Sequence, residues 1–297
     1  MKPKKPIKLQ QSLLKELKGK TILITGGAGS IGSALTKKIL EYPASSVRVL
    51  DIDEHALFKL NRVAKDSRLR LLLGNIHDKD RIELAGNGAD IIIHTAAVKN
   101  IEITEFNPIE TIDTNINGTV NLIKMAIRNK PLKFLNISTD KAAEPSTLYG
   151  TTKQMGERLT SWAGAHISTT KFASIRFGNV FETRGNVFEI WNDEVKDKKP
   201  LSITEPKMIR YFFHVNEAVD FILQCLPLID KGEIFVPKMN SYKIKDLAQK
   251  ISKNYKVIGL RQGEKMEEIL ITRDEKKKAE ENKDMWIIKP YLTGYKK

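Results

Sequence analysis

The chain has 297 residues, 41% of them hydrophobic and 29% charged, with 11 prolines, one cysteine and a formal net charge of +14. This length and composition are typical of one large α/β domain or of two closely joined domains, and they exclude a mainly disordered, collagenous or disulfide-stapled chain. Cys225 has no second cysteine to pair with, and its apolar surroundings predict a buried thiol, so we expect a reducing, cytoplasmic compartment.

The positive charge permits an anionic partner but does not select one. Seven lysines lie in residues 1–20 and three more at 276–278, where solvated charge is the simplest interpretation. No element concentrates lysine and aromatic side chains, so we expect no nucleic-acid partner, and we expect no metal site. No run approaches the roughly 18 apolar residues of a membrane span, and the N-terminus lacks the apolar core of a signal peptide. We therefore expect neither a membrane span nor secretion.

Residues 1–20 are predicted to form an N-terminal extension with an amphipathic helix. The segment has five apolar residues at close to helical spacing: Ile7, Leu9, Leu13, Leu14 and Leu17. Gly19 then ends the pattern. The apolar stripe could dock on a membrane or a partner subunit, but packing against its own domain is the commoner fate of such a helix.

Short β-rich runs then alternate with helical segments. Six runs are predicted strands: Thr21–Thr25, Val47–Asp51, Leu69–Leu73, Ile91–Thr95, Phe134–Ser138 and Ala173–Phe177. Most are apolar on both faces, as the buried strands of a parallel sheet are. Their alternation with helices predicts an α/β fold with a doubly wound parallel sheet and right-handed crossovers.

The alternation stops after Phe177, where a turn-rich stretch begins. We therefore assign residues 21–178 to a dinucleotide-binding Rossmann domain, to which 207–231 returns with a further strand and helix. Residues 179–206 and 232–297 are predicted to form a smaller lobe over the carboxyl edge of the sheet, where open α/β sheets bind ligands.

A glycine-rich turn lies between the first predicted strand and the helical pattern that follows. Glycines at this spacing let the chain turn tightly, bring backbone N–H groups close to a pyrophosphate and pack the helix against the strand. The predicted cofactor contacts in this turn are Gly26, Gly29, Ser30, Ile31 and Gly32. A glycine turn without a ligand is the alternative, but its position in the first predicted βαβ unit favours a bound dinucleotide.

Asp51 ends the second strand 19 residues after Gly32, where an acid can accept both adenosine ribose hydroxyls. Its carboxylate would repel a 2′-phosphate, and Ile52 follows it instead of a neutralising arginine, so NAD is favoured over NADP. Asn75 and Ile76 follow the third strand and are placed to contact the adenine, although an ordinary turn would have the same sequence.

Tyr149 and Lys153 are four residues apart in a predicted helix and therefore share one face. A phenol with a pKa of about 10 is a poor base at neutral pH. A lysine ammonium and a positive nicotinamide beside it both favour the phenolate, so we expect a lowered pKa for Tyr149. With Thr139 after the fifth strand, the pair predicts a catalytic site.

These motifs resemble the extended short-chain dehydrogenase/reductase superfamily and, within it, the soluble inverting UDP-N-acetylglucosamine 4,6-dehydratases that open pseudaminic acid synthesis. The resemblance begins at Gly19 and runs through TILITGGAGSIG, HTAAVKNI, NPIETIDTNINGT, STDKAAEPSTLYGTTK, RFGNVFETRGNV, ITEPKMIRYFFHV, GEIFVPK and RQGEKMEEILIT. Membrane-anchored retaining relatives usually have methionine in place of Tyr149 and carry N-terminal spans. The chain departs from the family pattern at Ile52, where arginine often reads NADP, at Glu144 in place of asparagine and at Gln262 in place of proline.

The resemblance implies further site residues. The implied cofactor contacts are Ala96, Ala97, Lys99, Asn115, Tyr149 and Lys153, and Asn115 is also implied to support the active-site helix. The implied substrate contacts are Lys99, Asn179, Arg184, Arg210, Arg261 and Glu264. Among them, Arg210 and Arg261 would clamp the two phosphates, which suits planar guanidinium groups. Asn179 would contact the sugar diphosphate, and Glu264 would accept hydrogen bonds from the uridine ribose.

The resemblance also implies roles for Asp140 and Lys141. A 4,6-dehydration oxidises C4, removes the C5 proton, expels the C6 hydroxyl as water and returns hydride to C6. Lys141 would be the C5 base and Asp140 the acid for the C6 hydroxyl, and Thr139, Tyr149 and Lys153 complete the catalytic set. In water the neutral tautomer of the Asp–Lys pair lies about 9 kcal/mol above the ion pair, so we expect it to be reached only with substrate bound.

The function implied is a nucleotide-sugar 4,6-dehydratase acting on UDP-N-acetylglucosamine in surface glycan synthesis, in a homo-oligomer, with inversion at C5 left open. One alternative is a nucleotide-sugar 4-epimerase, which needs Tyr149 and Lys153 but no acid and base at 140 and 141. Another is a catalytically silent NAD-binding regulator. For the pair Asp140 and Lys141 itself, the alternative is a structural salt bridge at the end of the strand.

Overall fold

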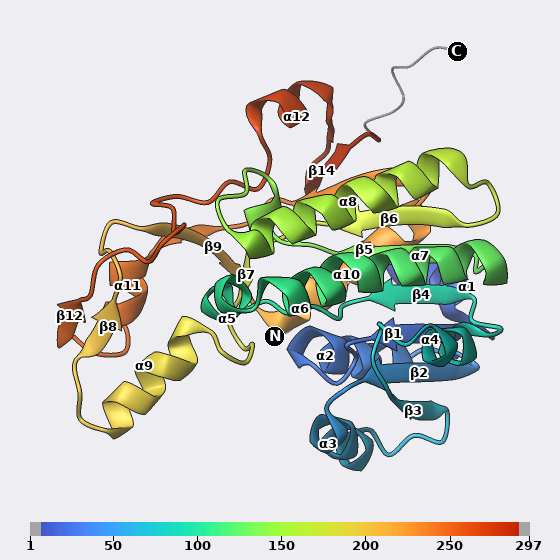
Figure 1. The fold of residues 1–297 in the computed structure, drawn as a ribbon, viewed down its shortest axis with the longest axis horizontal. Coiled ribbons are helices and arrows are strands. Elements are labelled where there is room, and N and C mark those ends of the chain that lie inside the picture. Colours follow the sequence, from blue (N-terminus) through green and yellow to red (C-terminus); the bar gives the residue numbers. More distant parts are fainter. Residues whose placement is uncertain (1–6, 291–297) are drawn as a thin grey trace.

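Nine strands form one large sheet in the computed structural model, which describes residues 7–290 (Figure 1). In the order in which they lie side by side, the strands are β13 (Glu280–Glu281), β14 (Met285–Ile288), β10 (Lys231–Pro237), β6 (Lys171–Ile175), β5 (Lys133–Ile137), β4 (Ile91–His94), β1 (Thr21–Thr25), β2 (Ser46–Asp51) and β3 (Leu69–Leu73). The strands from β3 to β10 pair in parallel, and β14 and β13 add antiparallel strands at one edge. The six predicted strands are present with boundaries shifted by at most two residues, and the doubly wound parallel sheet is confirmed.

Helices cover both faces of the sheet because its central strands are apolar on both sides. In β1, Ile22 and Ile24 pack into one hydrophobic core, whereas Leu23 between them packs into the other. The first core is closed by α1 (Ile7–Leu17), α2 (Ser30–Leu40) and α10 (Val215–Cys225), and the second by α4 (Lys79–Gly86), α7 (Gly118–Asn129) and α8 (Leu148–His166). Across residues 7–290, no helix has the length and apolar character that spanning a membrane requires.

The other helical segments of residues 7–290 are α3 (Glu54–Ala64), α5 (Ile101–Phe106), α6 (Pro108–Ile112), α9 (Val187–Lys196), α11 (Ile244–Gln249) and α12 (Arg273–Lys278), a π-helix η1 (Asp113–Asn117) and the 3₁₀ turns η2 (Asp140–Ala142) and η3 (Leu226–Leu228). Among them, α3 packs on β2 and β3, α12 contacts β14, and α9 and α11 belong to the second lobe. The segments η1 and η2 follow β4 and β5 in the chain and belong to the site described below.

The predicted amphipathic helix near the N-terminus is confirmed as α1. Leu13 and Leu17 are fully buried, and α1 contacts η3 and α10. Glu16 accepts a hydrogen bond of 2.6 Å from Lys133 Nζ at the start of β5. Its apolar face therefore packs on its own domain. Residues 1–6 of the predicted extension lie outside the described residues.

A second lobe is built from two small sheets and two helices, which lie to the left of the large sheet in Figure 1. One sheet holds β11 (Ser241–Lys243), β9 (Ile209–Phe213) and β7 (Asn179–Val180), and the other pairs β12 (Tyr255–Val257) with β8 (Leu201–Ile203). Trp191 of α9 is fully buried against Leu201, Met208 and Phe212, with Ile244 of α11 in the same cluster. The lobe thus has its own hydrophobic core.

The observed sheets cross the boundary that the sequence suggested between the two lobes. Residues 232–297 were expected to belong to the smaller lobe, but β10 and β14 extend the large sheet beside β6. Their apolar residues Ile234, Val236 and Ile288 pack together with Leu270. The division into a cofactor domain and a substrate lobe stays an expectation, and residues 291–297 lie outside the described part of the chain.

A buried ion cluster anchors the chain that follows the second lobe. The Arg176 guanidinium donates to both carboxylate oxygens of Glu157 on α8, at 3.0 and 2.7 Å, and to both oxygens of Glu275 on α12, at 2.8 Å each. It also donates to the Leu270 carbonyl at 3.2 Å. Two carboxylates raise the pKa of Arg176 despite its burial. The cluster fixes the segment around residues 270–275, directly after the segment that lines the candidate site.

Candidate active site

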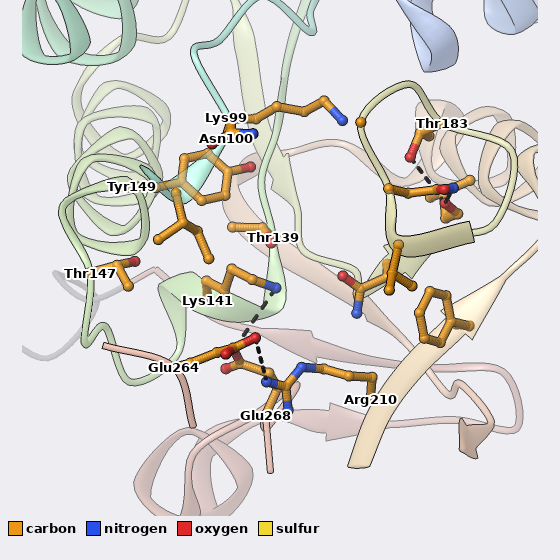
Figure 2. A pocket seen from close by; sticks show the side chains of 18 of the residues that line it. Lys99, Asn100, Thr139, Lys141, Thr147, Tyr149, Thr183, Arg210, Glu264 and Glu268 are labelled. Carbon is orange, nitrogen blue, oxygen red and sulfur yellow. Dashed lines mark hydrogen bonds and ion pairs between the residues drawn. The ribbon is translucent and has the colours of Figure 1, made fainter. Parts of the chain in front are cut away.

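A cavity of about 360 Å³ opens at the carboxyl ends of β4, β5 and β6, between the large sheet and the second lobe (Figure 2). Thr95 and Ala97 follow β4, Thr139 and Lys141 follow β5, and Gly178 follows β6. Ile203, Arg210 and Glu264 line it from the opposite side. Ligands of open α/β sheets bind at this edge, so this cavity is the candidate site.

The glycine turn between β1 and α2 is tight enough to require glycine. Gly26 has a φ of +66°, and a Cβ atom there would lie 2.6 Å from the backbone of Ala96. A Cβ atom on Gly32 would overlap the Gly26 carbonyl. Gly29, which precedes α2, offers no side-chain cap, so N–H groups of the first turn of α2 remain available to an anion.

Asp51 stands beside this turn at the end of β2. Its Oδ2 accepts from the Ala28 N–H at 2.9 Å and its Oδ1 from the Asp53 N–H at 3.1 Å. Asn75 uses its side-chain oxygen to accept from the His77 N–H at 3.0 Å, and Ile76 is buried in the core. The carboxylate therefore has the expected position, while adenine contacts of Asn75 and Ile76 stay predictions.

The loop between β7 and α9 crosses this turn. The Arg184 N–H donates to Ser30 Oγ at 3.0 Å, and Lys99 Nζ donates to the Arg184 carbonyl at 2.8 Å. The Arg184 guanidinium is exposed and lies 3.4 Å from Asp53 Oδ2. Arg184 was expected among the substrate contacts with Arg210, but the structure places it at the glycine turn, since its loop reaches back over α2.

Tyr149 and Lys153 lie in the first turns of α8, which begins because the Thr147 hydroxyl accepts from the Gly150 N–H at 3.2 Å. Both line the cavity. Burial, with a smaller contribution from the Asp140 charge, raises the pKa of Tyr149, although a hydrogen bond with Thr139 opposes the shift. Burial also lowers the pKa of Lys153 to about 8. The expected lowering of the Tyr149 pKa is therefore not produced by the protein's own groups, because desolvation outweighs them.

Asn115 connects α8 to the loop after β4. Its Oδ1 accepts from the Val98 N–H at 2.8 Å, and its Nδ2 donates to the Val98 carbonyl at 2.9 Å and to Thr152 Oγ1 at 3.0 Å. Asn115 is buried within the π-helix η1, a local widening of the helix that is frequent at functional sites. This geometry agrees with the expectation that Asn115 supports the active-site helix.

His94 forms a buried polar contact below the site that the sequence did not reveal. Its ring nitrogens lie 2.8 Å from Thr25 Oγ1 and 3.0 Å from Thr119 Oγ1. Because the Thr119 hydroxyl donates its own hydrogen to the Asn115 carbonyl at 2.7 Å, we assign His94 Nε2 as the donor to Thr119 and Nδ1 as the acceptor. Burial, reinforced by the charge of Lys153, lowers the pKa of His94 to about 3, so the ring is neutral at physiological pH.

Asp140 and Lys141 form an ion pair at the end of β5. Lys141 Nζ donates to Asp140 Oδ1 at 3.0 Å, and the Thr139 hydroxyl donates to the same oxygen at 3.0 Å. The Asp140 side chain is fully buried, and its Oδ2 has no hydrogen-bond partner among the described residues. Thr139 and Lys141 line the cavity, and Asp140 lies behind them.

The predicted phosphate-binding arginines both line the cavity but differ in setting. Arg210 is buried, donates at 2.8 Å to the carbonyls of Ile209 and Lys265, and lies 3.9 Å from Glu264 Oε1 (Figure 2). Arg261 is exposed and pairs through Nε with Glu102 of α5 at 3.2 Å. Asn179, Lys99 and Glu264 line the cavity as well. The structure thus brings most of the implied substrate contacts to one cavity.

Glu268 is a cavity residue that the sequence analysis missed. It is buried, and its Oε1 lies 3.9 Å from Lys141 Nζ. The adjacent Glu267 is exposed, because Glu267 bridges to Ile209 of β9 and successive residues of extended chain face opposite sides. Two consecutive glutamates gave no signal of which one turns inward. Within residues 7–290, no group of three or more His, Cys, Asp or Glu side chains is arranged to hold a metal ion.

Comparison with known proteins identifies relatives over most of the chain. The chain is 40% identical to a protein of Methanocaldococcus jannaschii named "Uncharacterized membrane protein", over 92% of this chain and 87% of that one. It is 38% identical to an inverting UDP-N-acetylglucosamine 4,6-dehydratase of Campylobacter jejuni, covering 92% and 84% of the two chains. It is also 33% identical to a UDP-glucose 4-epimerase of Rickettsia bellii, covering 94% and 88%.

Solved structures share the architecture. The crystal structure of Pen from Bacillus thuringiensis superposes with a TM-score of 0.89 at 35% identity, covering 93% of this chain and 90% of that one. DesIV from Streptomyces venezuelae, at 21% identity and a TM-score of 0.78 over 86% and 90%, has the same Rossmann-type fold. The family model described as "Polysaccharide biosynthesis protein" matches residues 22–290. The chain therefore belongs to this polysaccharide biosynthesis protein family, with the fold of the short-chain dehydrogenase/reductase enzymes.

Proposed function

We propose that this protein is a nucleotide-sugar-modifying enzyme, and specifically a 4,6-dehydratase of UDP-N-acetylglucosamine that inverts C5. The observation that carries the proposal is the Asp140–Lys141 pair, 3.0 Å apart, beside the cavity that Tyr149 and Lys153 also line. Oxidation at C4 alone needs only Tyr149 and Lys153. An acid and a base next to it supply what elimination of water requires. The C. jejuni relative, at 38% identity, is named for this reaction.

The residues at the glycine turn fit a nicotinamide dinucleotide. The turn leaves no room for a Cβ at Gly26 or Gly32, which gives a pyrophosphate close access to the backbone, and α2 presents its N-terminus there. Asp51 lies where ribose hydroxyls would be accepted, and the exposed Ile52 provides no positive charge for a 2′-phosphate. We therefore favour NAD over NADP. When bound, it supplies a reversible hydride acceptor for the sugar.

The chain's own groups divide the proton transfers between them. Tyr149 takes the proton of the C4 hydroxyl, and the buried Lys153 on the same helix face stabilises the phenolate that results. Lys141 removes the C5 proton, which the C4 ketone acidifies, and Asp140 protonates the C6 hydroxyl as it leaves. Thr139, which donates to Asp140 at 3.0 Å, orients the acid. The net change at C5 and C6 is loss of one water molecule.

The opposite wall suits the uridine diphosphate part of the substrate. Arg210 is held by backbone carbonyls and faces the cavity, and Arg261 lies at its margin. Guanidinium groups bind phosphate oxygens in a bidentate manner. We propose that these two arginines hold the diphosphate, that Glu264 accepts a ribose hydroxyl and that Asn179 and Lys99 contact the sugar diphosphate.

A 4-epimerase is the second candidate, because the chain is 33% identical over most of its length to an enzyme of that name. Epimerisation would use Tyr149 and Lys153 and leave Asp140 and Lys141 as a structural pair. Incubation of the purified protein with UDP-N-acetylglucosamine, followed by NMR, separates the two. We expect a 4-keto-6-deoxy product with inverted C5, whereas a C4 epimer that keeps its C6 hydroxyl would refute the dehydratase.

A pair of variants strengthens this test. Lys141→Met should lower formation of the 6-deoxy product by about 100-fold or more, the usual loss when a general base is removed. Lys124→Met, at an exposed lysine of α7, is the matched control and should keep the parent rate. Dehydration at the parent rate by Lys141→Met would show that the pair is structural.

We also propose that the chain assembles into a homo-oligomer. Six large apolar side chains are exposed on neighbouring helices α5, α6 and α8: Ile103, Phe106, Ile109, Ile112, Met155 and Trp162. Exposed apolar side chains gathered on neighbouring helices are typical of an interface. Sedimentation velocity should give a mass above 33.7 kDa, and Phe106→Glu should shift it toward the monomer.

A further inference from the structure

Glu268 is a carboxylate in the wall of the cavity to which the reaction above gives no role. It is 4% exposed and lies deeper than its neighbours Glu264 and Glu267. Its Oε2 is buried and accepts no hydrogen bond from the described residues. A buried carboxylate oxygen without a hydrogen bond is unusual and calls for an explanation.

Lys141 connects this carboxylate to the proposed acid. Lys141 Nζ lies 3.0 Å from Asp140 Oδ1 and 3.9 Å from Glu268 Oε1, so it is close to two buried carboxylates. Figure 2 shows Lys141 beside Glu268. A second ammonium, Lys265 Nζ, lies 4.0 Å from Glu268 Oε2. Arg210 and Glu264 compensate each other nearby at 3.9 Å. Asp140, which does not line the cavity, already accepts two hydrogen bonds at Oδ1, whereas Glu268 faces the cavity.

Two carboxylates around one ammonium change the number of protons that the group can hold. With Asp140 and Lys141 alone, the acid and the base must share a single proton, so Lys141 becomes neutral only by giving its proton to Asp140. If the group of Asp140, Lys141 and Glu268 holds a second proton, Asp140 stays protonated while Glu268 can still accept the proton of Lys141.

We propose that Glu268 receives the proton of Lys141 and so makes it a base, while Asp140, which has taken up a proton from solvent before the sugar binds, keeps that proton. This inference rests on the proposed dehydratase function. An Nζ–H bond of Lys141 breaks and an O–H bond forms on Glu268, after the 3.9 Å gap closes by about 1 Å to hydrogen-bond length. Neutral Nζ then takes the C5 proton, and the C5–H electron pair forms the C5–C6 double bond. The C6–O bond breaks, and its oxygen takes the Asp140 proton and leaves as water.

Glu268 thus acts through Lys141 as a positioning residue for a proton and need not touch the sugar. Glu268→Gln keeps the shape of the side chain but cannot accept the proton. We expect kcat for release of the 6-deoxy product to fall by about 100-fold, with KM within about twofold of the parent value. Exchange of the C5 hydrogen with deuterated solvent should fall in parallel. Glu268→Asp, which restores a carboxylate, should recover at least about tenfold of the lost rate.

Controls separate this role from a structural one. Glu267→Gln removes the same charge from the exposed neighbour and should keep the parent kcat. UDP affinity, measured by calorimetry, should be unchanged in Glu268→Gln. A parent-like kcat in Glu268→Gln overturns the inference about Glu268 but leaves the proposed function standing. Equal losses of kcat in Glu268→Gln and Glu268→Asp, together with weakened UDP affinity, also overturn the inference and indicate a structural role for Glu268. A parent protein that releases no 6-deoxy product refutes the proposed function and the inference with it.

Discussion

Replacement of Lys153 by methionine tests how strongly the site excludes water. Burial lowers the pKa of Lys153 from 10.5 to about 8, which corresponds to about 3 kcal/mol of unfavourable free energy for the buried ammonium. Below pH 8 the lysine is protonated in both the folded and the unfolded chain, and this cost is fully present. Between pH 8 and 10.5 the unfolded chain binds more protons, so the stability of the parent protein rises with pH in this window.

Lys153→Met has no such group, and its stability should lack this rise. We expect the free energy of unfolding of the parent, minus that of the variant, to increase by about 3 kcal/mol between pH 7 and about pH 10.5. Urea unfolding at constant ionic strength measures this difference, and titrations common to both proteins cancel. Lys124→Met, at an exposed lysine, should show no pH-dependent difference from the parent. A difference for Lys153→Met that stays flat across this window would refute the claim that Lys153 is desolvated.

Three further perturbations follow from the geometry. Gly26→Ala should destabilise the protein by about 2 kcal/mol or more in urea unfolding and weaken dinucleotide binding in calorimetry, because the φ of Gly26 is +66° and Ala96 leaves no space for a Cβ atom. Gly29→Ala is the control: the φ of Gly29 is −68°, so its stability should change by less than about 1 kcal/mol. Arg176→Met leaves two buried carboxylates unpaired and should cost about 3 to 5 kcal/mol in the same assay, and a smaller loss would show that water reaches the cluster. Arg210→Ala should weaken UDP binding by about 2 to 4 kcal/mol in calorimetry, and by more than Arg261→Ala, because Arg210 is buried and preorganised. If both variants bind UDP as tightly as the parent protein, neither arginine belongs to the site.

The elements that the sequence predicted are those with a local signal. The predicted strands are short, mainly apolar runs, and the central ones are present because burial on two faces of a parallel sheet demands such a run. The cofactor turn and the pair on α8 were likewise found from spacings of a few residues. The antiparallel addition of β14 to β10 had no such signal, since pairing at a sheet edge depends on which distant segment arrives there.

The parts of the site that escaped prediction depend on long-range contacts and burial. Arg184 reaches Ser30 across 154 residues of chain, and no local pattern encodes that approach. Glu268 turns inward because its neighbour Glu267 bridges to β9. The pKa expected for Tyr149 with a positively charged nicotinamide beside it stays a prediction; the sequence shows the neighbouring Lys153 but not the desolvation that raises this pKa in the chain by itself.

The cavity combines two electrostatic settings that suit the two halves of the proposed reaction. Around α8, burial favours the neutral forms of Tyr149, Lys153 and His94, and no carboxylate forms a salt bridge with Lys153 in the described chain. In the proposed reaction the phenolate of Tyr149 would be stabilised by Lys153 together with a positively charged nicotinamide, so proton removal at C4 would depend on the occupied site. Around η2, Lys141 is instead flanked by carboxylates at 3.0 and 3.9 Å, so protons can move without creating net charge. Oxidation at C4 is thereby tied to ligand binding, and elimination is tied to a preformed group of acids and a base.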